Sequence, residues 1–211
     1  MTEYFDFEDG NGKVPAHRHN NGGGWVANTA FVAPTAYVGL NAKVYGHSEV
    51  YNYARVYEHS RVYDYSRVYG HSRVYDYAKV YGQSKVYDYS RVYGHSRVYD
   101  YAEVHKHAKV FEHSEVHGQS KVRGYAEVRG DADVGGKARV SGIERSDGYT
   151  FIYVPDDSGA MKVQAGCRDF TMEEAKKHWK ETRGLTTLGN ETMEILKSIK
   201  RLSKFRPEGC V

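Results

Sequence analysis

Residues 64–77 read DYSRVYGHSRVYDY, and residues 88–101 repeat that stretch letter for letter. Valine occupies every sixth position of the surrounding chain from Val26 to Val140, which makes 20 hexapeptides with no insertion. The residue two positions before each valine is Ala or Ser from Val32 onward. Since side chains alternate across a strand and a tight corner tolerates little bulk, the valine and the small residue are the two inward positions of a short strand and its corner.

The residues that follow each valine complete the pattern. From Val44 onward the second residue after the valine is mostly Gly, Asn or Asp, which tolerate a positive φ at a turn. A chain that turns once in every hexapeptide with valine inside closes into a solenoid, whose coils satisfy each other's backbone groups.

The order aliphatic, any, turn, any, small, any over residues 26–142 resembles the hexapeptide-repeat left-handed β-helix family. The resemblance implies left-handed winding and three hexapeptides per triangular coil. We therefore predict an all-β solenoid, a left-handed parallel β-helix of about 20 hexapeptides, with a small C-terminal α+β cap.

The chain divides into three predicted segments. Residues 1–24 are expected to form an N-terminal cap over the first strand edge, with a loop at PAHRHNNGGG (15–24), and residues 25–142 the β-helix. Residues 143–211 are expected to form a cap, with a hairpin of residues 149–154 and 160–165 followed by two helices. Thr171 and Glu174 form a capping box for a helix to Arg183, and Asn190 is expected to cap the second helix. This module resembles C-terminal modules of uncharacterised hexapeptide-repeat proteins of bacteria and phages.

Composition limits the classes of function. The chain has 211 residues, among them 20 Tyr, 11 His and 22 Gly, and its formal net charge of +3 is too small to predict general polyanion binding. Cys167 and Cys210 lie far apart and no apolar N-terminal segment is present, so we expect a cytoplasmic protein with free thiols. No stretch approaches the roughly 20 apolar residues of a membrane span, so no membrane partner is expected.

The sequence nearly repeats itself every two hexapeptides, whereas one coil is expected to contain three. Residues stacked directly above one another therefore come from opposite halves of the repeated unit. The turn column Gly46, Asp64, Gly82, Asp100, Gly118 illustrates this. Because like charges about 5 Å apart on neighbouring strands are destabilising, we interpret the alternation as charge separation. Tyrosines one position after the valines are predicted to stack as ladders on all three faces.

Cations beside these ladders suggest a binding surface. On the third face the predicted ligand-binding residues are Arg55, Tyr57, Arg73, Tyr75, Arg91, Tyr93 and Lys109. One interpretation is structural, with the cations held by neighbouring rings or by turn acids. The other is an anionic partner, such as a nucleotide, a glycan or nucleic acid, held by guanidinium groups beside stacking rings. The first face carries a second cation column of Lys43, Arg61, Lys79 and Arg97.

Most histidines occupy a corner position that Tyr or Gln fills elsewhere, which argues against catalysis. His105 and His107 lie where the repeat degrades and are the candidate catalytic bases, although no catalytic residue is assigned. His17 and His19 form an H-x-H motif that suggests a weak metal site, with a solvated loop as the alternative. Cys167 precedes a predicted helix and is either a nucleophile or a buried structural thiol.

Two classes of function remain. The first is a non-enzymatic β-solenoid that binds a ligand or assembles through its faces, without a cofactor. The second is implied by the family resemblance: a trimeric acyltransferase that binds CoA between neighbouring prisms. Such enzymes carry a projecting loop, which the uninterrupted repeat lacks.

Overall fold

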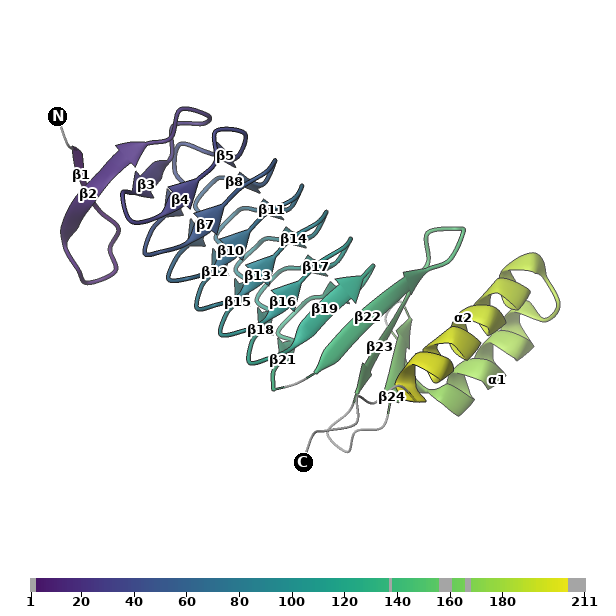
Figure 1. Cartoon of the computed structure of the whole chain (residues 1–211). Helices are drawn as coiled ribbons and strands as arrows, with labels where there is room; N and C mark the ends of the chain where they lie inside the picture. Colours follow the sequence, from purple (N-terminus) through teal and green to yellow (C-terminus); the bar gives the residue numbers. More distant parts are fainter. Residues whose placement is uncertain (1–2, 137, 156–160, 166–167, 205–211) are drawn as a thin grey trace. The chain divides into compact units, whose positions relative to one another are not determined.

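A computed structural model describes residues 3–136, 138–155, 161–165 and 168–204 (Figure 1). The chain divides into two compact units, residues 1–138 and 139–211. The division falls a few residues before the boundary predicted at residue 143, because Ser141 and Gly142 already pair with Tyr153 and Ile152 in the antiparallel sheet of the second unit.

The first unit is a β-solenoid, as predicted. Its first sheet stacks β3 (Trp25–Ala27), β6 (Lys43–Val44), β9 (Arg61–Val62), β12 (Lys79–Val80), β15 (Arg97–Val98), β18 (Glu115–Val116) and β21 (Asp133–Val134). The second sheet stacks β4 (Phe31–Val32), β7 (Glu49–Val50), β10 (Arg67–Val68), β13 (Lys85–Val86), β16 (Glu103–Val104) and β19 (Lys121–Gly124). The third sheet stacks β5 (Tyr37–Val38), β8 (Arg55–Val56), β11 (Arg73–Val74), β14 (Arg91–Val92), β17 (Lys109–Val110) and β20 (Glu127–Val128).

The register confirms a coil of three hexapeptides. Lys79 lies between Arg61 and Arg97 in the parallel first sheet, and each of these partners is three hexapeptides away along the chain. Successive strands of one sheet are therefore successive coils, and every third hexapeptide returns to the same face.

The predicted inward residues form the core of the solenoid. Every repeat valine from Val26 to Val140 is buried except Val32, which is half-buried in the outermost strand of the second sheet. The small residues before the valines are buried from Ala36 to Ala126, and every serine among them except Ser120 is hydrogen-bonded. The Ser66 hydroxyl, for example, donates to the carbonyls of Tyr63 (2.7 Å) and Val80 (3.1 Å). A buried hydroxyl is tolerated at this corner because two backbone acceptors face it.

An N-terminal hairpin extends the first sheet, at the purple end of Figure 1. Strands β1 (Glu3–Asp6) and β2 (Lys13–Arg18) are antiparallel, and β2 pairs with β3. The predicted covering of the first strand edge is therefore present. The loop predicted over residues 15–24 is wrong for residues 15–18, which belong to β2. Phe5 stacks on Trp25 with ring centroids 4.3 Å apart, so aromatic packing adds to the strand pairing that orders this segment.

Aromatic rings form the predicted ladders on each face of the solenoid. Neighbouring rings are nearly parallel, and on the third face the centroids of Tyr57, Tyr75, Tyr93 and Phe111 are 4.9–5.0 Å apart. A second kind of ladder follows the corners, where Tyr and His alternate as in Tyr53, His71, Tyr89, His107 and Tyr125. The interchangeable corner histidines are thus members of ring stacks.

The second unit is an antiparallel sheet covered by two helices. Its strands are β22 (Arg139–Glu144), β23 (Thr150–Pro155), β24 (Met161–Ala165) and β25 (Arg168–Thr171), and its helices are α1 (Met172–Arg183) and α2 (Thr187–Lys204). The β23–β24 hairpin and the Thr171–Glu174 capping box are confirmed. Helix α2 begins before Asn190, because the Thr186 hydroxyl accepts a hydrogen bond from the Gly189 N–H and caps the helix earlier.

A compact aromatic and aliphatic core holds this unit together. Phe151 and Val163 from the sheet are buried against Trp179 of α1 and Leu196 of α2. Cys167 and Cys210, which were expected to be free thiols, lie outside the described residues.

Candidate anion-binding groove

The cation column predicted on the third face is present, but within the described part of the chain only some of its positive charges have a compensating partner. Arg55, Arg73, Arg91 and Lys109 lie opposite one another on successive strands. The Arg55 guanidinium lies 5.1 Å from the ring centroid of Tyr37, and the Lys109 ammonium lies 2.7 Å from a carboxylate oxygen of Glu127. Among the described residues, no acid lies at ion-pair distance from Arg73 or Arg91, whose exposed side chains water can solvate at little cost.

The ladder geometry on this face excludes one mode of binding. Tyr57 and Tyr93 cover the two faces of Tyr75, with centroid distances of 5.0 and 4.9 Å. A planar group inserted between two rings would need about 7 Å, twice the contact distance of carbon atoms. Within the stack, a ligand can therefore reach only the edges of the tyrosines.

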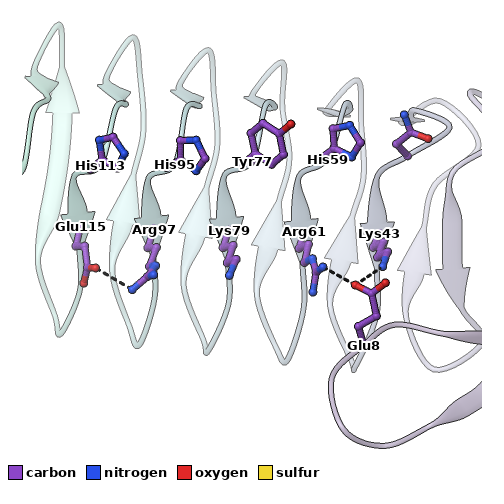
Figure 2. Close-up of a pocket in the computed structure, with 11 residues that line it drawn as sticks. Glu8, Lys43, His59, Arg61, Tyr77, Lys79, His95, Arg97, His113 and Glu115 are labelled. Atoms are coloured by element: carbon purple, nitrogen blue, oxygen red, sulfur yellow. Dashed lines mark hydrogen bonds and ion pairs between the residues drawn. The ribbon is translucent and has the colours of Figure 1, made fainter.

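The structure places a groove elsewhere, along the corner where the chain passes from the third sheet to the first. It encloses about 720 Å³ and follows successive coils (Figure 2). One side is a row of stacked rings, the ring row, which consists of His59, Tyr77, His95 and His113. The other side is the cation row, which consists of Lys43, Arg61, Lys79 and Arg97.

The hexapeptide pattern explains why the two rows run together. Residues 59–61 read HSR, residues 77–79 read YAK and residues 95–97 read HSR. The middle residue of each triplet points into the core, so its two neighbours point outward on either side of the corner. Each of these three coils thus adds one ring and one cation to the groove.

Acids close both ends of the cation row. Glu8, from the loop between β1 and β2, places one carboxylate oxygen 3.0 Å from the Lys43 ammonium and 2.8 Å from the Arg61 guanidinium. These two cations lower the pKa of Glu8, which therefore stays ionised. At the other end Glu115 accepts hydrogen bonds from Arg97 and from the Tyr99 hydroxyl, each at 3.0 Å.

Lys79 lies in the middle of the groove and is the uncompensated cation of the row. It is half-buried and lies between Arg61 and Arg97 in register. Figure 2 shows no acid beside it, and in the described part of the chain no carboxylate lies at ion-pair distance from its ammonium group. Because stacked like charges oppose folding, this arrangement favours a mobile or bound anion at Lys79.

A second hollow of about 500 Å³ adjoins the ring row and shares His59, Tyr77 and His95 with the groove. Its acidic lining consists of Glu58 and Asp76. The Asp76 side chain raises the pKa of Glu58, as expected for two neighbouring carboxyl groups. The ring row therefore separates a basic side from an acidic side.

The two candidate catalytic histidines do not converge on one site. His105 continues the tyrosine ladder of the second face, 4.8 Å from Tyr87 between ring centroids, and burial lowers its pKa. His107 belongs to a corner stack, where Tyr89 and Tyr125 cover its two faces. Their ring nitrogens are accessible only at the edges of two different ladders.

The remaining candidates are the two histidines of the H-x-H motif and Cys167. The Nδ1 atom of His17 lies 3.0 Å from Oδ1 of Asn28, whereas His19 is buried, with Nε2 3.1 Å from the carbonyl of Ala36. The described residues contain no group of three or more His, Cys, Asp or Glu side chains placed to hold a metal ion. Cys167, the candidate nucleophile, lies outside the residues that the structure describes.

None of the seven residues predicted to bind a ligand lines either hollow. The sequence nevertheless contains a signal for the groove, because the corner histidines His59 and His95 are each separated by a single residue from a first-face cation, Arg61 and Arg97. If the histidines are regarded only as substitutes for tyrosine, their proximity to the cations is overlooked. The contribution of Glu8 has no local signal, since it lies 53 residues from Arg61.

Both helices belong to the second unit, and over the described ranges neither is long and apolar enough to cross a membrane. No protein-family model matches the sequence, and no curated protein matches it significantly.

Proposed function

We propose that the protein is a non-enzymatic β-solenoid that binds an anionic ligand in the corner groove. The observation that carries this proposal is the position of Lys79, a half-buried lysine in register between Arg61 and Arg97 that lines the groove and has no carboxylate partner among the described residues. A ligand anion at this point would relieve the repulsion within the cation row and gain charge-assisted hydrogen bonds.

The groove is better suited to the proposal than the third face. Arg73 and Arg91 also lack an acidic partner among the described residues, but they are exposed on a sheet whose tyrosine faces are covered. In the groove, by contrast, three imidazoles and one phenol present their edges beside the cations and add hydrogen-bonding groups.

The acyltransferase alternative, with CoA as cofactor and a trimeric assembly, receives less support from the geometry. Each strand of the solenoid from β3 to β21 follows its predecessor at the hexapeptide spacing, so no projecting loop interrupts the coils. His105 and His107 belong to separate ring stacks and share no hollow among those described above.

Calorimetric titration with tripolyphosphate, CoA and an oligouronate at low salt tests the proposal. At least one anion should bind, the affinity should fall as salt rises because screening acts on exposed charge, and Lys79→Glu should abolish binding without lowering the melting temperature. Arg73→Glu with Arg91→Glu tests the third face, and Arg67→Glu with Lys85→Glu on the mixed-sign second face is the control.

Loss of binding in the third-face variant, with full binding by Lys79→Glu, would move the site to the face predicted from the sequence. Absence of binding by all three anions would refute the proposal. Acyl transfer from acetyl-CoA that His105→Ala with His107→Ala abolishes would instead establish the enzymatic alternative.

A further inference from the structure

The groove already holds a carboxylate that belongs to the protein itself. Glu8 extends from the hairpin loop to Lys43 and Arg61, which come from two successive coils, and its side chain remains largely exposed. The backbone of Glu8 has a φ of 60°, a conformation that is costly for glutamate, and its N–H donates to Asp6 at 2.8 Å. The loop thus positions one carboxylate where a ligand carboxylate would bind.

The acidic side of the ring row restricts what else the ligand carries. Glu58 and Asp76 line the hollow beside His59, Tyr77 and His95. One oxygen of Glu58 accepts the Asp76 N–H at 2.9 Å, and one oxygen of Asp76 accepts the Gly94 N–H at 2.9 Å. The two carboxyl groups also interact with each other, which raises the pKa of Glu58, and this acidic pair favours hydroxyl or amide donors and repels a second anion.

A ligand that spans both sides therefore needs anionic groups on one edge and hydrogen-bond donors on the other. Polyphosphate offers acceptors on every side and meets the repulsion of Glu58 and Asp76. A chain of sugar acids carries one carboxylate and several hydroxyl groups on each sugar, so it can satisfy the cations, the ring edges and the acids together.

Spacing distinguishes a glycan from other extended polyanions. The cations repeat once per coil, at about 4.8 Å. An extended acidic peptide advances by about 3.4 Å per residue, and phosphates follow a duplex strand at about 3.4 Å. A 1,4-linked pyranose chain advances by one ring per sugar, close to the coil spacing.

We infer that the ligand of the groove is an acidic oligosaccharide of linked uronic acids that lies along the solenoid axis. One carboxylate binds at Lys79, hydroxyl groups donate to Glu58 and Asp76, and the ring row contributes phenol and imidazole edges. Glu8 competes with the ligand for Lys43 and Arg61. This inference rests on the proposed anion-binding function.

The test is titration calorimetry of the whole 211-residue chain with tetragalacturonate, its fully methyl-esterified form, tripolyphosphate and pentaglutamate. Tetragalacturonate should bind most tightly and its ester at least about tenfold more weakly, because the ester keeps the hydroxyl groups and loses the charges. Lys79→Gln should weaken tetragalacturonate binding about tenfold, whereas Lys85→Gln on the second face should leave it unchanged.

Two further variants separate the parts of the inference. Glu8→Gln should strengthen tetragalacturonate binding about threefold by removing the competing charge, and Glu3→Gln, in the same hairpin, should not. Asp76→Asn should weaken tetragalacturonate binding but not tripolyphosphate binding. Asp88→Asn, the equivalent turn residue at another corner, should change neither.

Each contrary outcome has a distinct meaning. Tighter binding of tripolyphosphate or pentaglutamate than of tetragalacturonate overturns the saccharide inference and leaves the anion groove in place. Equal binding of the acid and its ester overturns the role of the carboxylates. Absence of binding by all the anions refutes both the inference and the proposed function.

Discussion

The Oδ2 atom of Asp64 accepts a hydrogen bond from the backbone N–H of Gly82, one coil further along the chain, at 3.1 Å. Asp100 and Gly118 repeat the relationship at 3.1 Å. The glycines are required for a different reason, because a Cβ atom on Gly82 would lie 2.7 Å from the backbone nitrogen of Asp100. The alternation of Gly and Asp therefore provides a hydrogen bond and a close approach, in addition to the charge separation inferred from the sequence.

Removing the Asp64 carboxylate should destabilise the solenoid. Asp64→Ala leaves the Gly82 N–H without its acceptor and places alanine at a φ of 60°, so we expect a loss of about 1–2 kcal/mol. Asp64→Asn keeps an acceptor and a residue that tolerates this φ, so it should lose less than half as much. Urea denaturation measures both variants, and equal losses would contradict the hydrogen-bond interpretation.

A charge in the valine core should unfold the middle coils. Val74 is fully buried, and Val74→Asp places an unpaired carboxylate among valines at a cost of several kcal/mol. Far-UV circular dichroism and thermal melting measure the loss. The neighbouring exposed substitution Arg73→Asp is the control and should change the melting temperature little; an unchanged melting curve for Val74→Asp would mean that the inward register is wrong.

The tyrosine ladders should make the protein sensitive to alkali. Burial raises the pKa of Tyr75, Tyr87 and Tyr99 to about 12, whereas an unfolded tyrosine ionises near its ordinary value of about 10. The folded state thus binds more protons in this interval, so its stability is retained below about pH 10 and falls as the pH rises towards about 12. Urea midpoints measured across this interval report the decline, which Tyr75→Phe with Tyr87→Phe should reduce. A midpoint that stays constant throughout would contradict the prediction.

The second unit should depend on a buried arginine. The Arg145 guanidinium is 2% exposed and binds both carboxylate oxygens of Asp147, at 2.8 and 2.6 Å, and the Thr192 hydroxyl at 2.9 Å. Asp147→Asn leaves the guanidinium without its counter-charge and should lower the melting temperature of this unit by several degrees. Fluorescence of Trp179 in a Trp25→Phe background reports this unit alone.

Acid should remove the difference in stability between Asp147→Asn and the parent protein. Arg145 lowers the pKa of Asp147 to about 2, so the contribution of the carboxylate is present above its ordinary pKa and disappears as the pH falls through about 2. Lys197→Met, an exposed substitution on α2, is the control. A stability difference that persists unchanged in this acid range would exclude the ion pair as its source.

The spacing of valine predicted the solenoid because each inward position is determined by its neighbours within one hexapeptide. The ring ladders followed from the same periodicity, since equivalent residues of every third hexapeptide must stack once the coil length is assumed. The start of α2 was harder to predict from the sequence, because Asn190 is a good capping residue in isolation. Thr186, which precedes it in the chain, caps the helix instead.

Contacts between distant segments could not be inferred in this way. The hairpin is ordered by β2–β3 pairing and by the stacking of Phe5 on Trp25, and the position of Glu8 depends on both. The two rows of the groove were visible in the sequence as separate columns. Whether the two rows line one groove depends on the shape of the corner between the third and first sheets, and the periodicity of the sequence does not specify that shape.

The mismatch between a repeat of two hexapeptides and a coil of three limits how such a chain can grow during evolution. The identical stretches at 64–77 and 88–101 already lie on different faces, with Arg67 in β10 and Arg91 in β14. A duplication of two hexapeptides would move every later column to another sheet, and one of three would place Asp above Asp in the turn column that contains Asp64. Only an insertion of six hexapeptides, which is two whole coils, preserves both the faces and the alternation, so lengthening without disruption proceeds in steps of two coils.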